Sequence, residues 1–205
     1  QEILSQRGFH GGRKAAAGDP DLEPFVEELY RNPTRELLRR LPAVAKNRKE
    51  RTGVIAAPLL SHENAEIRRA ALEIVGRYWD PLAAVQVALL VGDPDPFLSM
   101  DAARCLESRP SPDALPVLFS LVKGGEKKGK QVALRLLGQW AEKDARPMLP
   151  FLKDSSPELR VAALGAIARD HVLRDAMLSD LSKFLEDPNG EVRAAAVGCF
   201  YGAKA

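Results

Sequence analysis

Three histidines, His10, His62 and His171, are the first candidates for acid–base or metal chemistry in this chain of 205 residues. None of them stands in an HxxxH or HExxH pattern, which would place two ligands on one face of a helix. The GxSxG motif of hydrolytic nucleophiles is absent, and neither cysteine belongs to a CxxC or Cys/His cluster with metal-ligand spacing. The sequence therefore predicts a protein that is not an enzyme and that holds no metal and no cofactor.

Two short stretches have the composition of ligand-binding loops. GFHGGRK at residues 8–14 is rich in glycine and basic residues, but it lacks the GK[ST] ending of a phosphate-binding loop and follows no predicted strand. GDPDP carries Asp93 and Asp95, but the remaining ligands of a calcium loop are missing. We interpret the first stretch as part of a flexible basic arm and the second as a solvent-facing turn.

The bulk composition favours a helical protein that does not insert into a membrane. Alanine and leucine, which lose least on entering a helix, are plentiful, and aromatic residues make up only 6% of the chain. No run of 18 apolar residues occurs. The formal net charge of +2 is too small to argue for nucleic acid by itself. Because the chain begins with Gln1, we expect a processed product or a fragment, and we expect a cytoplasmic location.

Stretches of nearly the same sequence recur along the chain: EIRRAALEIV at 66–75, ELRVAALGAI at 158–167 and EVRAAAVGCF at 191–200. Two weaker copies, LSMDAARCL and GKQVALRLL, start at residues 98 and 129. The first positions of the copies are spaced by 31, 31, 30 and 33 residues, and they are Ile67, Leu98, Gly129, Leu159 and Val192. A regular period in this range predicts a solenoid, in which each repeat stacks on its neighbours.

Each repeat is predicted to contain two helices. Positions one, five, eight and nine of each copy are mainly apolar, and at ~100° per residue they share one helical face. A second apolar pattern upstream, with a spacing of four, predicts a first helix, and connectors such as GDPDP and DPNG suit tight turns. The expected fold is all-α, a right-handed α-solenoid of about five stacked antiparallel helix pairs over residues 49–205.

The segment before the repeats is less regular. Residues 21–48 read as two helices separated by Asn32-Pro33, and we expect them to form a degenerate N-terminal cap that covers the apolar end of the solenoid. Residues 1–20 contain four glycines and no sustained period. We therefore expect residues 1–20 to be a flexible basic arm or linker.

The turn and helix residues add a specific resemblance. Asp154 precedes Arg160 by six residues, and Asp187 precedes Arg193 by the same distance. The pattern resembles the HEAT-repeat family, in particular the short bacterial HEAT-like repeats also seen in phycobilisome-lyase-type proteins. The resemblance implies that turn aspartates and helix arginines form a buried ladder between neighbouring repeats. The ladder residues that it implies are Asp154, Arg160, Asp187, Arg193 and Arg68.

The implied ladder has gaps toward the N-terminus. His62 stands where an acid should precede Arg68, and Ser99 stands where an arginine should follow Asp93. The repeat between them and Asp154 has Gly124 and Lys130 at these positions. We therefore expect the ladder to be complete only near the C-terminus.

The polar face of the second helices is unusually basic. Positions three, seven and eleven of each copy point away from the predicted core, and only one glutamate stands among the arginines there. We expect a basic stripe on the concave surface, although an ordinary solvated face would have the same composition. The stripe consists of Arg69, Arg77, Arg104, Arg135 and Arg169. Further basic clusters lie at residues 31–51 and 123–130.

Cysteines and tryptophans are assigned to packing. Cys105 and Cys199 share the eighth position of the second helix, so we expect two buried thiols that lie too far apart for a disulfide. Trp79 and Trp140 fall near the ends of second helices and are expected to fill gaps between repeats.

The favoured function is a non-enzymatic scaffold that binds another protein, through an acidic segment where the partner meets the arginine stripe. One alternative is nucleic-acid binding, in which the stripe would contact phosphates. Another, implied only by the resemblance, is a lyase-like or chaperone-like accessory role.

Overall fold

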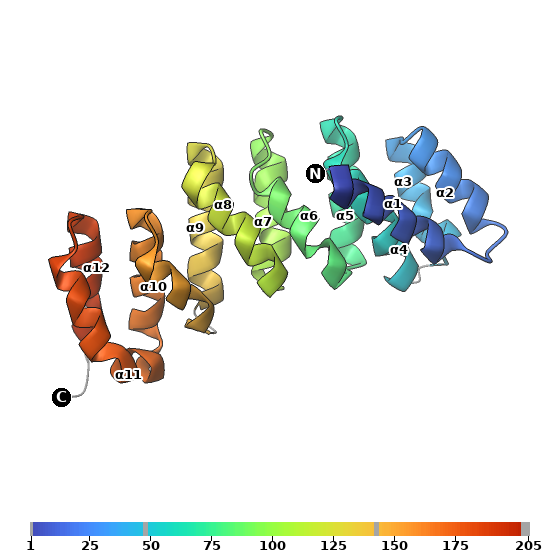
Figure 1. Ribbon diagram of the computed structural model, residues 1–205. Coiled ribbons are helices and arrows are strands. Elements are labelled where there is room, and N and C mark those ends of the chain that lie inside the picture. Colours follow the sequence, from blue (N-terminus) through green and yellow to red (C-terminus); the bar gives the residue numbers. More distant parts are fainter. Residues whose placement is uncertain (1, 47–48, 142–143, 202–205) are drawn as a thin grey trace. The chain divides into compact units, whose positions relative to one another are not determined.

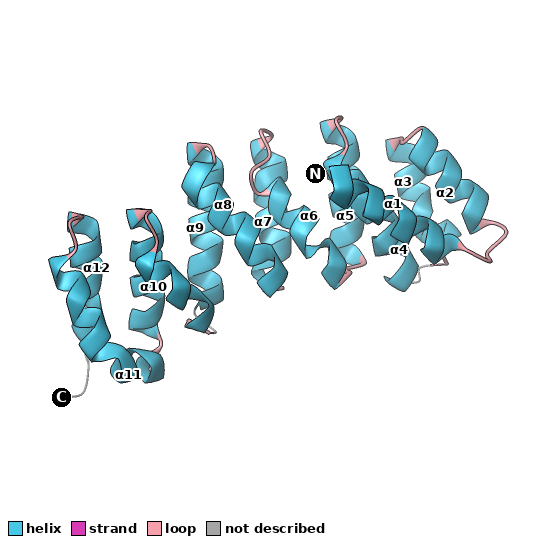
Figure 2. Cartoon of the chain, in the orientation of Figure 1, coloured by secondary structure: helices cyan, strands magenta, loops and turns pink. Residues whose placement is uncertain are grey.

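The computed structural model describes residues 2–46, 49–141 and 144–201, and every regular element in these ranges is helical (Figure 2). The chain divides into two compact units, Gln1–Ala114 and Leu115–Ala205. We describe each unit by itself.

Unit 1 consists of seven α-helices and three short 3-10 segments within its described residues (Figure 1). In chain order they are α1 (Glu2–Ala16), α2 (Leu22–Arg31), α3 (Arg35–Val44), α4 (Lys49–Ala56), η1 (Ala57–Ser61), α5 (Ala65–Arg77), η2 (Pro81–Ala83), α6 (Ala84–Leu90), α7 (Pro96–Glu107) and η3 (Pro112–Ala114). Helices α4 and η1 pack on α5, α6 packs on α7, and α5 lies between α3 and α7.

Unit 2 continues the same alternation of first and second helices. Its described elements are α8 (Leu115–Gly124), α9 (Lys127–Ala141), η4 (Arg146–Lys153), α10 (Pro157–Arg169), α11 (His171–Leu181), η5 (Ser182–Glu186) and α12 (Gly190–Phe200). Helix α8 packs on α9, η4 packs on α10, and α11 with η5 packs on α12. The second helices stack in turn, with α10 between α9 and α12. The predicted all-α fold of stacked helix pairs is therefore confirmed.

Turn residues start the second helices. The side chain of Asn64 accepts a hydrogen bond from the backbone N–H of Glu66, and the side chain of Asn189 does the same for Glu191. Asp95 caps α7 by accepting from two backbone N–H groups. These caps satisfy donors that the helix itself leaves unpaired, so each repeat begins its second helix at a defined residue.

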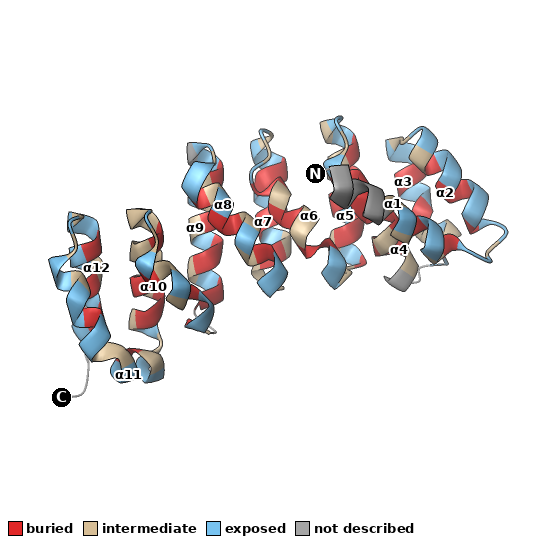
Figure 3. Ribbon diagram, viewed as in Figure 1, coloured by how far each residue is buried: buried red, intermediate tan, exposed pale blue. Residues whose placement is uncertain are grey.

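The core lies along the facing sides of the paired helices (Figure 3). Positions one, five, eight and nine of the repeat are buried in α5 and α10. In α10 they are Leu159, Ala163, Ala166 and Ile167, each fully buried. The apolar periodicity thus identified the buried face of these helices correctly.

The first residues of the chain differ from the expected flexible arm. Residues Glu2–Ala16 form α1, which packs on α4, η1 and α2. The Phe9 ring meets the Tyr30 ring edge-on with centroids 4.8 Å apart, and Arg13 donates to Glu27 at 2.6 Å. A Cβ on Gly12 would overlap the Tyr30 hydroxyl, so this glycine permits close packing where its composition suggested flexibility.

Candidate functional site

A first arginine–aspartate pair joins two repeats of unit 1. Arg68 of α5 donates from Nε and Nη2 to the carboxylate oxygens of Asp93, at 2.8 and 3.0 Å. Its Nη1 donates to the carbonyl oxygens of His62 and Glu63, at 2.9 and 2.7 Å. The two side chains are only 13% and 6% exposed. One guanidinium thus ties the turn before α5 to the turn before α7, which fixes one repeat on the next.

Unit 2 contains a second pair of the same geometry. Arg160 of α10 donates from Nε and Nη2 to the carboxylate of Asp187, both at 2.9 Å, and from Nη1 to the carbonyl oxygens of Asp154 and Ser155. The hydrogen bonds from Arg160 hold the pKa of the Asp187 carboxyl below its ordinary value. Each arginine therefore binds the turn aspartate of the following repeat.

The expectation of a ladder complete only near the C-terminus is wrong, because Arg68 and Asp93 form a full pair in unit 1. The arginine of one repeat pairs with the aspartate of the next, so a repeat needs to supply only one of the two residues. His62 and Ser99 therefore do not prevent the pair between Arg68 and Asp93. Ser99 instead donates its hydroxyl to the carbonyl oxygen of Val91 at 2.6 Å.

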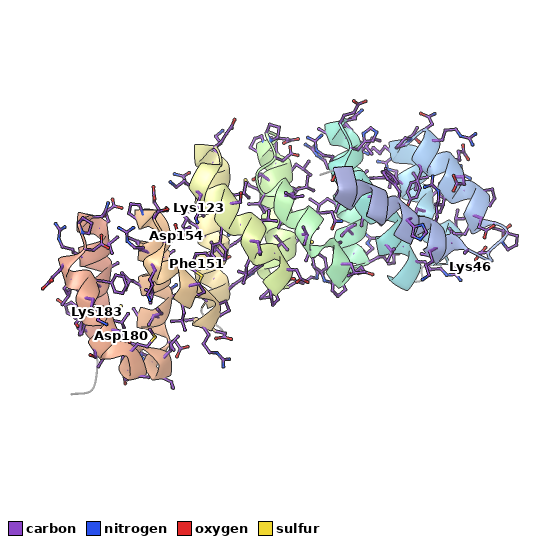
Figure 4. All side chains as sticks on the ribbon, viewed as in Figure 1. Lys46, Lys123, Phe151, Asp154, Asp180 and Lys183 are labelled. Atoms are coloured by element: carbon purple, nitrogen blue, oxygen red, sulfur yellow. The ribbon has the colours of Figure 1, made fainter. Side chains whose placement is uncertain are left out.

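At the start of unit 2, lysines replace arginine in the ion pairs between neighbouring repeats. Lys123 of α8 lies 2.7 Å from Asp154 (Figure 4). Burial alone would raise the pKa of Asp154, but hydrogen bonds from Lys123 and the backbone of Ser156 leave it lowered. Lys130 lies 2.6 Å from Glu158, and hydrogen bonds from Lys130 and Ser156 lower the pKa of Glu158 to about 2. These contacts join neighbouring helix pairs of unit 2.

The arginines of the expected stripe are distributed over the two units. Arg69 and Arg77 lie on α5, Arg104 on α7, Arg135 on α9 and Arg169 on α10. In unit 1, two of these arginines form ion pairs with acidic side chains. The Nη2 of Arg69 lies 2.6 Å from Asp95, and the Nη1 of Arg104 lies 3.3 Å from Asp101. The structure therefore gathers three stripe arginines around α5 and α7, with part of their charge offset.

A first groove runs between α3 and α5, with a volume of about 110 Å³. Three arginines and a single glutamate line it, and they are Arg35, Arg39, Arg77 and Glu73. Its apolar lining comes from Leu38, Pro42, Ala70, Ile74 and Tyr78. Arg35 also lies 3.7 Å from Glu66, but both side chains are more than half exposed, so this pair is weak. The groove combines an apolar floor with a basic rim.

A second groove lies on the other side of α5, against α7, with a volume of about 500 Å³. Its charged residues are Arg69, Arg104, Arg109, Glu73 and Asp101. Glu73 lines both grooves, so α5 forms the ridge between them. The second groove has a larger volume than the first, and its charges are more nearly balanced.

Arg109 is a groove residue that the sequence did not indicate. It follows α7 and donates to the carbonyl oxygens of Cys105 and Gly76, both at 3.1 Å. Its guanidinium lies 5.1 Å from the centre of the Trp79 ring. The residue stands outside the repeat register, so helical phase gave no signal for it. Arg35 and Arg39 belong to the basic cluster at residues 31–51, but only the fold places them beside Arg77.

The groove of unit 2 has a different character. It has a volume of about 410 Å³ and is lined by Leu134, Gly138, Val161, Ala162, Gly165, Glu158, Glu191 and Arg169. Arg169 donates to the carbonyl oxygen of Gly138 at 3.2 Å. Arg135 is exposed on α9, outside the lining of this groove. Of these three grooves, the two in unit 1 are the more basic.

The candidate catalytic residues are not brought together. His10 lies on α1, His62 precedes α5 and His171 begins α11. Among the described residues, no group of three or more His, Cys, Asp or Glu could hold a metal ion. Cys105 and Cys199 are free thiols, and burial raises the pKa of both. Within the same described ranges, no helix is long and apolar enough to cross a membrane.

Comparison with known proteins identifies the repeat. Residues 55–137, which span η1 to α9, match a family described as HEAT repeats. The match supports a HEAT-like repeat over this part of the chain. No curated protein matches it. A crystal structure of an engineered protein from the Northeast Structural Genomics Consortium aligns over 98% of this chain and 96% of its own, at 14% identity and a TM-score of 0.37. HEAT repeats present extended surfaces that bind other proteins.

Proposed function

We propose that unit 1 binds an acidic, partly apolar segment of another protein, which lies along α5 in the two grooves beside it. The observation that carries this proposal is the convergence of Arg35, Arg39 and Arg77 on one groove with an apolar floor, where Glu73 is the only acid in the lining. Arginine binds carboxylates through two parallel hydrogen bonds, so its rim position favours an Asp- or Glu-containing segment. The apolar floor accommodates one or two apolar side chains of the same segment.

The charge distribution favours a protein partner over nucleic acid. The second groove contains Glu73 and Asp101 beside its arginines, and Arg69 is already paired with Asp95. Duplex DNA carries about one negative charge per 1.7 Å of helix axis, so its continuous backbone would meet these carboxylates. A peptide can place its acids opposite the arginines alone.

Unit 2 offers a second contact in this proposal. Arg169 stands at the edge of its mainly apolar groove, and Arg135 is exposed on the preceding second helix. We assign these two arginines a weaker, steering role, because rim charges chiefly raise the rate of association. The main binding energy is assigned to the grooves of unit 1.

The test is a charge reversal with a matched control. Arg39→Glu with Arg77→Glu reverses two exposed side chains of the first groove. Arg146→Glu with Lys183→Glu makes the same charge change at side chains of unit 2 that are 75% and 73% exposed. The probes are a short fluorescent peptide of glutamate and leucine, its lysine–leucine counterpart and a DNA duplex.

The wild-type protein should bind the acidic peptide, and fluorescence anisotropy should show weaker binding as salt rises. The groove reversal should weaken this binding by about tenfold or more, while the control should change it by less than about threefold. If the protein prefers the DNA duplex, or if both reversals weaken peptide binding equally, the grooves are not a site for an acidic segment.

A further inference from the structure

The first groove of unit 1 holds three arginines that converge from two helices. Arg35 and Arg39 lie four residues apart on α3, so their side chains share one face, and Arg77 stands in the last turn of α5. Two like charges at this spacing destabilise a helix, and α5 adds a third cation beside them. An anion between the guanidinium groups would relieve this repulsion.

The three arginines have few acidic partners within the described part of the chain. No side chain there forms an ion pair with Arg39 or Arg77. Arg35 reaches only Glu66, at 3.7 Å, and both side chains are more than half exposed. Glu73 lines the same groove, but among the described residues it forms no ion pair with any of the three. The lining therefore has a net charge of +2, from three arginines and one glutamate.

Other arginines of α5 and α7 differ in this respect. Each has an aspartate within 3.3 Å, and the pairs are Arg68 with Asp93, Arg69 with Asp95, and Arg104 with Asp101. The chain thus supplies acids for the arginines that face the second groove and the neighbouring repeat. It leaves the arginines of the first groove available to an anion from outside.

The first groove is small and has an apolar floor. Its volume is about 110 Å³, against about 500 Å³ for the second groove. Leu38 is fully buried, and Ala70, Ile74 and Tyr78 are nearly so. A group bound over this floor displaces water, and a lower local dielectric strengthens charge-assisted hydrogen bonds. The groove therefore suits one compact anion of double charge better than a run of separate carboxylates.

We infer that this anion is the phosphoryl group of a phosphoserine or phosphothreonine in the partner segment. A phosphorylated side chain carries about −1.5 to −2 charges at pH 7 and has three strong acceptor oxygens. One such group matches the charge of the lining and offers an oxygen to each guanidinium. A carboxylate supplies one charge and two oxygens, so it leaves one arginine without a partner. The inference rests on the function proposed for unit 1, and it names the residue that the first groove selects.

A nucleic-acid phosphate matches this groove less well. A phosphodiester carries one negative charge, about half that of a phosphorylated side chain, so part of the arginine charge stays uncompensated. The second groove, on the other side of α5, contains Glu73 and Asp101, which would repel a continuing nucleic-acid backbone. A phosphorylated protein segment can instead place a neutral or basic residue there.

The test compares three fluorescent peptides that differ at one central position. Glutamates and leucines flank a central phosphoserine, glutamate or serine. Fluorescence anisotropy with the full chain at about pH 7.5 should show that the phosphoserine peptide binds about tenfold or more tightly than the glutamate peptide. The serine peptide should bind most weakly of the three.

Two double variants locate the preference. Arg39→Gln with Arg77→Gln removes two guanidinium groups without altering the core, because both side chains are exposed. This variant should bind the phosphoserine and glutamate peptides within about twofold of each other. Arg104→Gln with Arg146→Gln is the matched control, since it removes the same charge at exposed side chains outside the first groove. The control should keep a preference of about fivefold or more.

A pH series gives a second readout, which general attraction between charges would not produce. The second ionisation of a phosphoserine lies near pH 6, whereas a peptide glutamate titrates near pH 4.3. The preference for phosphoserine should therefore shrink as the pH falls from about 7.5 to about 5.5. The charged and titratable side chains that face the bound group are Arg35, Arg39, Arg77, Glu73 and Tyr78, with Glu66 beside Arg35. No histidine is among these described residues.

The outcomes separate this inference from the proposal on which it rests. Equal binding of the phosphoserine and glutamate peptides by the wild-type protein would overturn the inference and leave the acidic segment in place, whereas no binding of any peptide would overturn both. A phosphoserine preference that survives in the Arg39/Arg77 variant would place the phosphoryl group elsewhere. Displacement of the phosphoserine peptide by inorganic phosphate or a DNA duplex, at phosphate concentrations no higher than those of an unlabelled copy of the peptide, would make the ligand a different phosphate and would also overturn it.

Discussion

Arg68→Ala removes the guanidinium that joins two repeats of unit 1. It deletes both hydrogen bonds to Asp93 and the two bonds to the backbone carbonyls before α5. The Asp93 carboxylate, only 6% exposed, then loses its cationic partner. Because a stranded buried charge is costly, this single change should destabilise unit 1 far more than the loss of an exposed arginine.

The geometry sets the size of the effect. Breaking a buried ion pair by removing one partner costs about 3–5 kcal/mol. The lower end applies here, because Arg68 is 13% exposed and the backbone N–H of Asp95 still donates to Asp93 at 2.9 Å. We therefore expect a loss of about 3 kcal/mol in the free energy of unfolding. With a urea m-value of about 1.5 kcal/mol per molar, the midpoint should fall by about 2 M.

Urea unfolding followed by circular dichroism measures this shift. Arg77→Ala is the matched control, since Arg77 is exposed in the last turn of the same helix and should change stability by no more than about 0.5 kcal/mol. Asp93→Ala alone and with Arg68→Ala completes a double-mutant cycle, in which we expect a coupling of about 2 kcal/mol. Equal midpoints for Arg68→Ala and Arg77→Ala, or a coupling near zero, would refute the role of the pair.

Three further predictions concern stability. Arg160→Ala should lower the urea midpoint more than Arg135→Ala, because Arg160 joins two repeats whereas Arg135 is exposed; equal shifts would contradict this assignment of faces. Glu158, whose pKa is lowered from 4.5 to about 2, contributes stability that is present above pH 4.5 and lost as the pH falls toward 2, so Glu158→Gln should flatten the fall in Tm across that window; an unchanged pH profile would argue against it. Gly53→Ala should lower the Tm because a Cβ would overlap the carbonyl oxygen of Tyr78, whereas Gly198→Ala, with nothing within 4 Å, should leave it unchanged or raise it.

The site was predictable only in part. Helical phase placed Arg69, Arg77 and Arg104 on second helices, but it could not show that Asp95 and Asp101 offset two of them. These acids stand at other positions of the repeat, and only side-chain geometry brings them near the arginines. The residues that complete the grooves come from α3 and from the segment just after α7, where the repeat period gives no information.

The sequence by itself determined the repeat, its two helices and their buried faces. The buried positions of α5 and α10 follow from local geometry, because residues three, four and seven apart on one helix share a face whatever surrounds it. Each capping residue bonds to a backbone N–H only two or three positions later, so the caps can also be recognised from the sequence. These features made the all-α fold of stacked helix pairs predictable.

Only the tertiary structure decided which repeat supplies each partner. The aspartate six residues before Arg160 and the aspartate twenty-seven residues after it are both available in the sequence, yet the carboxylate that binds is the later one, Asp187. The choice depends on how one helix pair is rotated and shifted on the next, which no spacing within a repeat encodes. The role of Gly12 in α1 also depends on the tertiary structure. Its glycine-rich surroundings predict a flexible segment, but Tyr30 packs against it, and a Cβ at this position would overlap the Tyr30 hydroxyl.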